Sequence, residues 1–265
     1  MRAEHLPSGL GATPDVYDFL RALPVRDDLV VLDAGFGDGR LRPWSAPRCR
    51  WIGIDIDADR VAHGARQRWT VLRSDLTTGI PLRSGAVDGV VLSCVLNVVP
   101  RRSERAAVVR EVARVLRPGG VVWIRDFVRL PEPDARVEPG PRTARWQAWR
   151  RRYDVGRELA AWVAGCAVDE LCPGSFPAFD IGPDEDPVLF GEHRYTAERF
   201  RAAVRAGRIN VPFLACHPTR AEIRSEWLSV GEHVSIRAVT AQARGGDMLP
   251  VDELLVRFRG SKPCW

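Results

Sequence analysis

The chain has 265 residues, of which 45% are hydrophobic, and a formal net charge of +5. This length suits one large α/β domain, or one domain with a substantial insertion. No apolar run approaches the roughly 20 residues that span a bilayer. The N-terminus lacks the apolar stretch of a signal peptide, so we expect a cytoplasmic protein. Lys262 is the only lysine, and a dispersed arginine surplus of this size indicates little about partners.

The six cysteines are scattered along the chain without a C-x-x-C pair. Such a distribution predicts neither a disulfide framework nor a zinc site, and we expect isolated thiols. The sequence therefore predicts no metal.

Apolar runs that end at a turn or a polar residue recur through the first half of the chain. They are typical of strands buried on both faces of a parallel sheet. A short helix is predicted before them over 14–22, with Thr13 as its cap. A longer helix is predicted over 102–116, ended by Arg117-Pro118-Gly119-Gly120. The five predicted strands lie at 29–32, 51–54, 69–72, 87–92 and 121–124.

The second half of the chain departs from this pattern. Loops are expected over 130–141 and 173–187, helices over 142–164 and 196–206, and strands over 234–239 and 254–258. The whole predicts a doubly wound, seven-stranded, mostly parallel α/β sheet, with an α-helical insertion after the fifth strand. The expected parts are a core at 1–129, an insertion at 130–192, and a C-terminal part at 193–265 that completes the sheet.

A glycine loop follows the first predicted strand. Gly35, Gly37 and Gly39 lie where a ligand meets the carboxyl edge of an open sheet, and glycine lets the backbone approach that ligand closely. Asp55 ends the next strand, a suitable position for accepting both hydrogen bonds of a ribose diol. Asp75 ends the third strand, where a carboxylate can accept a hydrogen bond from an adenine amino group.

A nicotinamide dinucleotide site shares the first two of these features. Its fingerprint is G-x-G-x-x-G, with the third glycine inside a helix that receives the pyrophosphate. Here the third glycine comes one residue early, and the stretch 40–47 that follows is broken by two prolines. A long phosphate-binding helix is therefore not expected, and an adenosyl ligand without phosphate fits better.

The ordered set of motifs over roughly 25–128 resembles the class I S-adenosylmethionine-dependent methyltransferase family. Val31 to Gly39 is similar to its first motif, Gly53 to Asp57 to the acidic end of its second strand, and 86–93 to its fourth strand. The resemblance implies a Rossmann-like fold and S-adenosylmethionine as cofactor. It places Asp33 and Gly35 at the amino-acid end of the cofactor, Asp55 at the ribose, Asp75 with Leu76 at the adenine, and Ser93 at the methionine arm. The cofactor-binding set is completed by Phe36, Gly37 and Ile56.

Two positions depart from the family pattern. Phe36 stands where a small or polar residue is common, and the helix after the glycine loop is clipped. Both features are expected to reshape the cofactor pocket.

The sequence does not identify a catalytic residue. Asn97 follows the fourth strand, where it either faces the transferred methyl group or caps the helix that begins near Ser103. His193 and His217 are weak candidates for a general base, as is His233. Each of these histidines has a structural or exposed role as its alternative.

Aromatic and arginine residues alternate over the predicted helix at 142–164, with Trp146, Trp149 and Tyr153 beside Arg150. This segment is either a nucleic-acid surface or a helix that packs its aromatic face over the active site. No Asp-Pro-Pro-Tyr or Asn-Pro-Pro-Tyr motif of an amine-specific DNA methyltransferase occurs. We therefore expect a small-molecule methyl acceptor, methylated on O or N. The alternatives are a nucleic-acid or protein acceptor, and a cofactor-binding protein without catalysis.

Overall fold

The computed structural model of the protein describes residues 19–41, 49–127, 156–180, 197–230, 237–240 and 251–257. The chain divides into two compact units. The first comprises Met1–Leu96, Glu104–Val128 and Arg220–Trp265, and the second comprises Asn97–Ser103 and Arg129–Thr219. The domain boundaries expected from the sequence stay a prediction.

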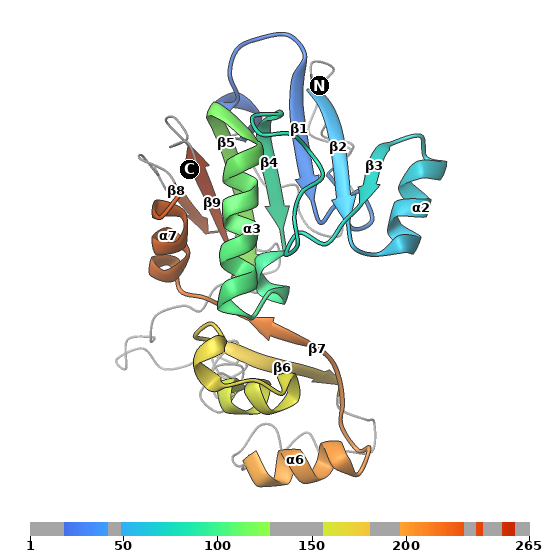
Figure 1. Cartoon of the computed structure of the whole chain (residues 1–265), viewed down its shortest axis with the longest axis vertical. Coiled ribbons are helices and arrows are strands. Elements are labelled where there is room, and N and C mark those ends of the chain that lie inside the picture. The colour runs from blue at the N-terminus through green and yellow to red at the C-terminus, as the bar shows by residue number, and fades with distance from the viewer. Residues whose placement is uncertain are drawn as a thin grey trace. The chain divides into compact units, whose positions relative to one another are not determined.

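The first unit contains a sheet with strand order β3-β2-β1-β4-β5-β9-β8 (Figure 1). Its first five strands are parallel to one another, β9 is antiparallel to β5, and β8 is antiparallel to β9. The expected α/β Rossmann-like fold is confirmed. The strands are β1 (Leu29–Ala34), β2 (Cys49–Asp55), β3 (Thr70–Arg73), β4 (Val87–Ser93), β5 (Leu116–Phe127), β8 (Arg237–Thr240) and β9 (Val251–Arg257).

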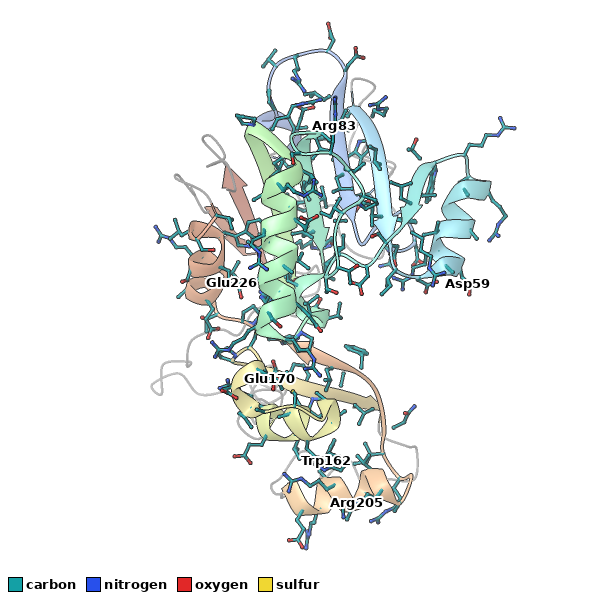
Figure 2. The ribbon with its side chains drawn as sticks, in the orientation of Figure 1. Asp59, Arg83, Trp162, Glu170, Arg205 and Glu226 are labelled. Carbon is teal, nitrogen blue, oxygen red and sulfur yellow. The ribbon has the colours of Figure 1, made fainter. Side chains whose placement is uncertain are left out.

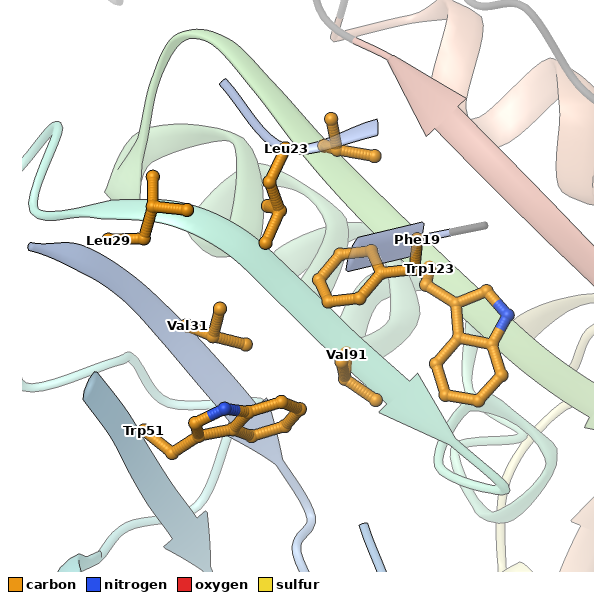
Figure 3. Close-up of a cluster of buried hydrophobic side chains, with 8 residues drawn as sticks. Phe19, Leu23, Leu29, Val31, Trp51, Val91 and Trp123 are labelled. Carbon is orange, nitrogen blue, oxygen red and sulfur yellow. The ribbon is translucent and has the colours of Figure 1, made fainter. Parts of the chain in front are cut away.

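A cluster of buried apolar side chains covers one face of this sheet (Figure 3). Phe19 lies in the short helical segment before β1, of which the structure describes 19–22, and Leu23 follows this segment directly. A Cβ at Gly89 of β4 would lie 2.7 Å from both side chains, so glycine lets this segment pack directly on the strand. The cluster consists of Phe19, Leu23, Leu29, Val31, Trp51, Val91, Val121 and Trp123.

The same unit contains the helices α2 (Ala58–Arg66) and α7 (Arg220–Leu228), together with α3 (Arg102–Val115) from Glu104 onward. Asp57 caps α2, because its side chain accepts hydrogen bonds from the N–H groups of Asp59 and Arg60. The α3 helix lies over the middle of the sheet in Figure 1 and buries a stripe of valines, Val108, Val109, Val112 and Val115. Periodicity predicted α3 within one residue, whereas α2 and α7 were not predicted.

The turn before the fifth strand is part of β5 itself. The pairing with β4 shifts from Val87↔Leu116 to Gly89↔Val121, so the strand contains an irregular stretch between Leu116 and Val121. Gly119 adopts a φ of 80° there, a conformation that favours glycine. The predicted end of α3 is therefore correct, but β5 begins at Leu116, five residues before its predicted start at 121.

The second unit contains a two-stranded antiparallel sheet of β6 (Ser175–Asp180) and β7 (Asn210–Cys216). The loop predicted over 173–187 is thus wrong at 175–180, because β6 is stabilised by pairing with a strand at least 30 residues away in sequence. The helix α6 (Ala197–Arg205) and the helical residues 156–164 bury Leu159, Phe200, Ala203 and Ile209 together. The predicted cap Thr196 and the aromatic stripe at 142–155 lie outside the described residues.

Short 3-10 turns occur at Leu96–Val98 and Val168–Glu170. The second turn and the start of α3 are joined within the second unit. Arg101 forms an ion pair with Glu170 at 3.2 Å, and the N–H of Cys172 donates to the carbonyl of Pro100. Figure 2 labels Glu170 in this region.

Candidate functional site

The predicted cofactor residues of the first four strands come together at the carboxyl edge of the sheet. The register pairs Asp33 with Gly53 and Ala34 with Ile54, so β1 and β2 end side by side. The chain stays joined beyond the strands, because the N–H of Gly35 donates to the carbonyl of Ile54 at 2.7 Å. The N–H of Ser74 donates to the carbonyl of Asp55 at 3.0 Å, which brings the end of β3 beside β2.

The glycine loop has a backbone that favours glycine at each of its three glycines. The φ angles of Gly35, Gly37 and Gly39 are 76°, 53° and 71°. A Cβ at Gly35 would lie 2.6 Å from Cγ2 of Val95, which leaves no room for a side chain. The loop therefore presents bare backbone at the edge of the sheet, as a closely approaching ligand requires.

Phe36 is buried behind this loop. A Cβ at Gly53 would lie 2.8 Å from the Phe36 ring, and one at Gly64 would lie 3.4 Å from it, so the ring fills the space between β2 and α2. It also meets Trp69 edge-to-face, with ring centroids 6.4 Å apart. The unusual residue at this position thus supports the loop from below.

Asp55 is the most constrained carboxylate of the site. Its side chain is 5% exposed; one oxygen accepts from the N–H of Gly37 at 2.9 Å, the other from the N–H of Asp57 at 3.0 Å. Arg60 of α2 lies 3.8 Å from it. An ionised carboxylate has about four acceptor positions, so two backbone bonds orient it and leave capacity for a ligand diol.

The next residue, Ile56, is a large apolar side chain that is 60% exposed directly after β2. Asp75 lies after β3, where its Oδ1 accepts from the N–H and the hydroxyl of Thr77 at 2.8 and 2.7 Å. Leu76 is buried beside it. An exposed apolar side chain near an oriented carboxylate fits an adenosyl group, whose ring is apolar on its faces and polar at its edge.

Two further predicted residues end the central strands. Asp33 is buried at the end of β1, and Ser93 is half-buried at the end of β4. The chain turns sharply after Ser93, with Cys94 at a φ of 56° and its N–H bonded to the carbonyl of Arg125 at 2.7 Å. This turn directs Val95 against Gly35.

Asn97 is buried in the 3-10 turn Leu96–Val98. It does not cap α3, because that helix begins at Arg102. Its predicted alternative role, facing the methyl group or the acceptor, stays a prediction.

Of the three histidine candidates, the structure describes His217. His193 and His233 lie outside the described residues. His217 follows β7 in the second unit, is 3% exposed, and meets Phe176 edge-to-face at 4.9 Å. Burial lowers the pKa of His217 to about 4, so its imidazole is neutral and weakly basic at pH 7.

Two residues of the site were missed by sequence reasoning. Val95 leaves no space for a side chain at position 35, so glycine is required there. Trp69 has the same effect at position 39, because a Cβ on Gly39 would overlap the Trp69 ring. Neither residue belongs to a motif, and both contacts join segments that are at least 30 residues apart in sequence. Only the folded sheet shows them.

The described residues contain no group of three or more His, Cys, Asp and Glu side chains that could hold a metal ion. Among the helices in the described ranges, none is long and apolar enough to cross a membrane. The expected cytoplasmic location stays a prediction.

Comparison with known families and proteins agrees with this arrangement. Residues 32–124 match a family model described as a methyltransferase domain. The chain is 31% identical over 138 residues to a trans-aconitate 2-methyltransferase of Azoarcus. This match covers 48% of this chain and 52% of the relative. It is 32% identical over 111 residues to a tRNA (carboxymethyluridine(34)-5-O)-methyltransferase of Arabidopsis thaliana, covering 42% of this chain and 26% of the relative. The chain thus spans between about a quarter and about half of these relatives.

Solved structures show the same fold at lower identity. A SAM-dependent methyltransferase from Methanosarcina mazei superposes with a TM-score of 0.60 at 18% identity, covering 93% of this chain and 97% of that one. An S-adenosylmethionine-dependent methyltransferase from Mesorhizobium loti gives a TM-score of 0.52 at 16% identity, covering 94% and 100%. Residues 32–124 therefore form a methyltransferase domain, and the chain has the fold of these S-adenosylmethionine-dependent methyltransferases.

Proposed function

We propose that this protein transfers the methyl group of S-adenosylmethionine to an oxygen or nitrogen atom of a small-molecule acceptor. The observation that carries the proposal is the Asp55 carboxylate, buried beside the glycine loop and oriented by the N–H groups of Gly37 and Asp57. A carboxylate held this way is preorganised for a diol and needs no rearrangement when the ligand binds.

The residues of the site have separate roles in this proposal. Asp55 binds the ribose hydroxyls, Ile56 covers one face of the adenine, and Asp75 with Leu76 binds its polar edge. The backbone of Gly35 and Gly37, with Asp33 and Ser93, binds the amino-acid end. Bound S-adenosylmethionine supplies an electrophilic methyl group on a sulfonium, and the chain contributes by holding the acceptor in line with it.

His217 is not the general base of this proposal. It is buried, and its lowered pKa makes it a poor proton acceptor near neutral pH. Asn97 is retained as a residue that orients the acceptor, because it follows the fourth strand by four residues and its side chain is buried. His193 is retained as the candidate base for acceptors that must lose a proton.

The small-molecule acceptor is supported by the relative with the longest of these matches, the trans-aconitate 2-methyltransferase. An RNA acceptor is the second candidate, because another relative is a tRNA methyltransferase of similar identity. The two candidates differ in their response to salt, since RNA binding through arginines weakens steeply as salt rises.

The first experiment is a calorimetric titration with S-adenosylmethionine and with NAD on the wild type and on Asp55→Ala. Binding of S-adenosylmethionine that Asp55→Ala weakens supports the proposal. Binding of NAD alone contradicts it. Transfer of a labelled methyl group is then measured to trans-aconitate, to a panel of hydroxy and amino acids, and to bulk tRNA. Labelling of tRNA alone favours the second candidate, and cofactor binding without any transfer favours a non-catalytic protein.

A further inference from the structure

A buried guanidinium lies behind the site on α3. Arg105 is 1% exposed, and its Nε donates to both carboxylate oxygens of Glu226 on α7, at 2.7 and 2.9 Å. Its Nη1 donates to the carbonyl of Leu96 at 2.7 Å. Figure 2 labels Glu226 on α7, beside α3. One side chain therefore joins α7 to the segment that follows β4.

This arrangement is costly if its only role is stability. The Arg105 guanidinium is removed from water and the Glu226 side chain is 27% exposed, and well-packed apolar residues often replace such an ion pair without loss of stability. Burial raises the pKa of Glu226, although the neighbouring Arg105 guanidinium acts in the opposite direction. The hydrogen bond to Leu96 is the part of the arrangement that an apolar pair cannot reproduce.

The segment bonded by Arg105 supports the glycine loop. Leu96 comes directly after Val95, whose Cγ2 occupies the space beside Gly35. Cys94, with its φ of 56° and its bond to Arg125, fixes the start of the same segment. A series of contacts thus runs from Glu226 through Arg105 and the Leu96 carbonyl to Val95 and the loop.

We propose that Arg105, held in place by Glu226, is a positioning residue that fixes residues 94–96 beneath the glycine loop and so sets the affinity for the cofactor. The proposal rests on the cofactor site of the proposed function. Arg105 acts through Val95 and does not itself bind the ligand. The planar guanidinium is needed, because its N–H groups point in fixed directions, so that Nε reaches Glu226 while Nη1 reaches the carbonyl of Leu96, whereas the ammonium of a lysine is a point donor.

The test compares Arg105→Lys with the double variant Arg105→Met/Glu226→Met. The double variant removes both charges, so its thermal midpoint is expected to stay near that of the wild type. Its dissociation constant for S-adenosylmethionine, measured by calorimetry, is expected to rise about tenfold, which corresponds to loss of one charge-assisted hydrogen bond. Amide hydrogen exchange over 94–97 in the cofactor-free protein is expected to become faster. Arg105→Lys is expected to change the thermal midpoint little and to weaken the affinity for S-adenosylmethionine more strongly.

Arg117→Met is the matched control. Arg117 pairs with the buried Asp88 at 2.5 Å, near the start of β4, at the opposite end of that strand from Val95. This variant is expected to lower the thermal midpoint without changing cofactor affinity or exchange over 94–97.

Two outcomes overturn the proposal. One is a double variant that binds S-adenosylmethionine like the wild type with unchanged exchange over 94–97. The other is an affinity that follows the thermal midpoint across all variants, Arg117→Met included. A wild type that binds no S-adenosylmethionine contradicts the proposed function and the effect on affinity, whereas hydrogen exchange still tests whether Arg105 fixes the segment.

Discussion

The carboxylate of Asp55 accepts a hydrogen bond from the N–H of Gly37 at 2.9 Å, joining the end of the second strand to the middle of the glycine loop. The same carboxylate accepts from Asp57, the residue that caps α2. A single buried side chain therefore orients the loop and the start of the next helix, as well as the predicted ribose site.

Replacing Asp55 by Ala is expected to weaken S-adenosylmethionine binding about tenfold to hundredfold, because one to two charge-assisted hydrogen bonds are lost. The affinity of Asp55→Asn for S-adenosylmethionine is expected to lie between those of the wild type and Asp55→Ala, since the asparagine amide retains one acceptor oxygen. Calorimetric titration measures both. Asp59→Ala, an exposed change in the first turn of α2, is the control. Equal affinity of Asp55→Ala and wild type would remove the main support for the cofactor site.

Replacing Gly35 by Ala is expected to weaken cofactor binding at least about tenfold, because the new Cβ meets Val95 and the backbone is strained. The double variant Gly35→Ala/Val95→Ala is expected to recover part of the affinity, since it relieves the overlap but not the strain. Gly165→Ala is the control: Gly165 lies outside the loop, with a φ of 61° and nothing within 4 Å of a Cβ, so backbone strain there is expected to lower stability without changing cofactor affinity. If Gly35→Ala bound S-adenosylmethionine as tightly as the wild type, the prediction would be wrong, because the loop would have adapted to the new side chain.

Replacing Phe36 by Ala is expected to lower the free energy of unfolding by about 3 kcal/mol or more, because the ring fills the space between β2 and α2. Cofactor affinity is expected to fall less than in Asp55→Ala. Urea unfolding and calorimetry provide the two measurements. Unchanged stability with lost binding would instead place the ring in the cofactor pocket.

His217 is expected to make the protein sensitive to acid. Its folded pKa of about 4 lies below the ordinary value of 6.5, so the unfolded chain binds a proton first as the pH falls. The resulting loss of stability is absent above about pH 7.5, grows through the window from 6.5 to 4, and amounts to about 2 kcal/mol at pH 5. Urea unfolding at pH 7.5 and pH 5 measures it. His217→Phe is expected to reduce the difference in unfolding free energy between the two pH values. If that difference stayed the same in the variant, the acid sensitivity would come from other groups.

Glu111 and Arg114 of α3 are expected to stabilise the turn after Asp75. Arg114 donates to the carbonyls of Ile80 and Leu82, and to Glu111 at 2.7 Å. The side-chain hydrogen bond from Arg114 lowers the pKa of Glu111, so this contribution is complete above pH 4.5 and is lost as the pH falls below it. Arg114→Met is expected to destabilise the protein by about 1 to 3 kcal/mol. Hydrogen exchange over 79–82 measures the local effect, and slow exchange there in the variant would contradict it.

The sequence by itself determined the parallel core and predicted the location of the candidate site at its carboxyl edge. Buried strands such as 29–32 and 87–92 are continuous apolar runs, and each is followed at once by the residues of the site, so both signals are local in sequence. The helix α3 was predicted for the same reason, since its valines recur at helical spacing. The strand β6 was not predicted, because it contains Pro177 and is held by pairing with β7, which is distant in sequence.

Only the tertiary structure decided how the site is supported. It buried the ring of Phe36 behind the glycine loop, placed Val95 against Gly35, and excluded Asn97 as the cap of α3. It also joined Arg105 to Glu226 across 121 residues of sequence. Local patterns record which face of an element is buried, whereas contacts between distant segments depend on packing and leave no periodic signal in the sequence.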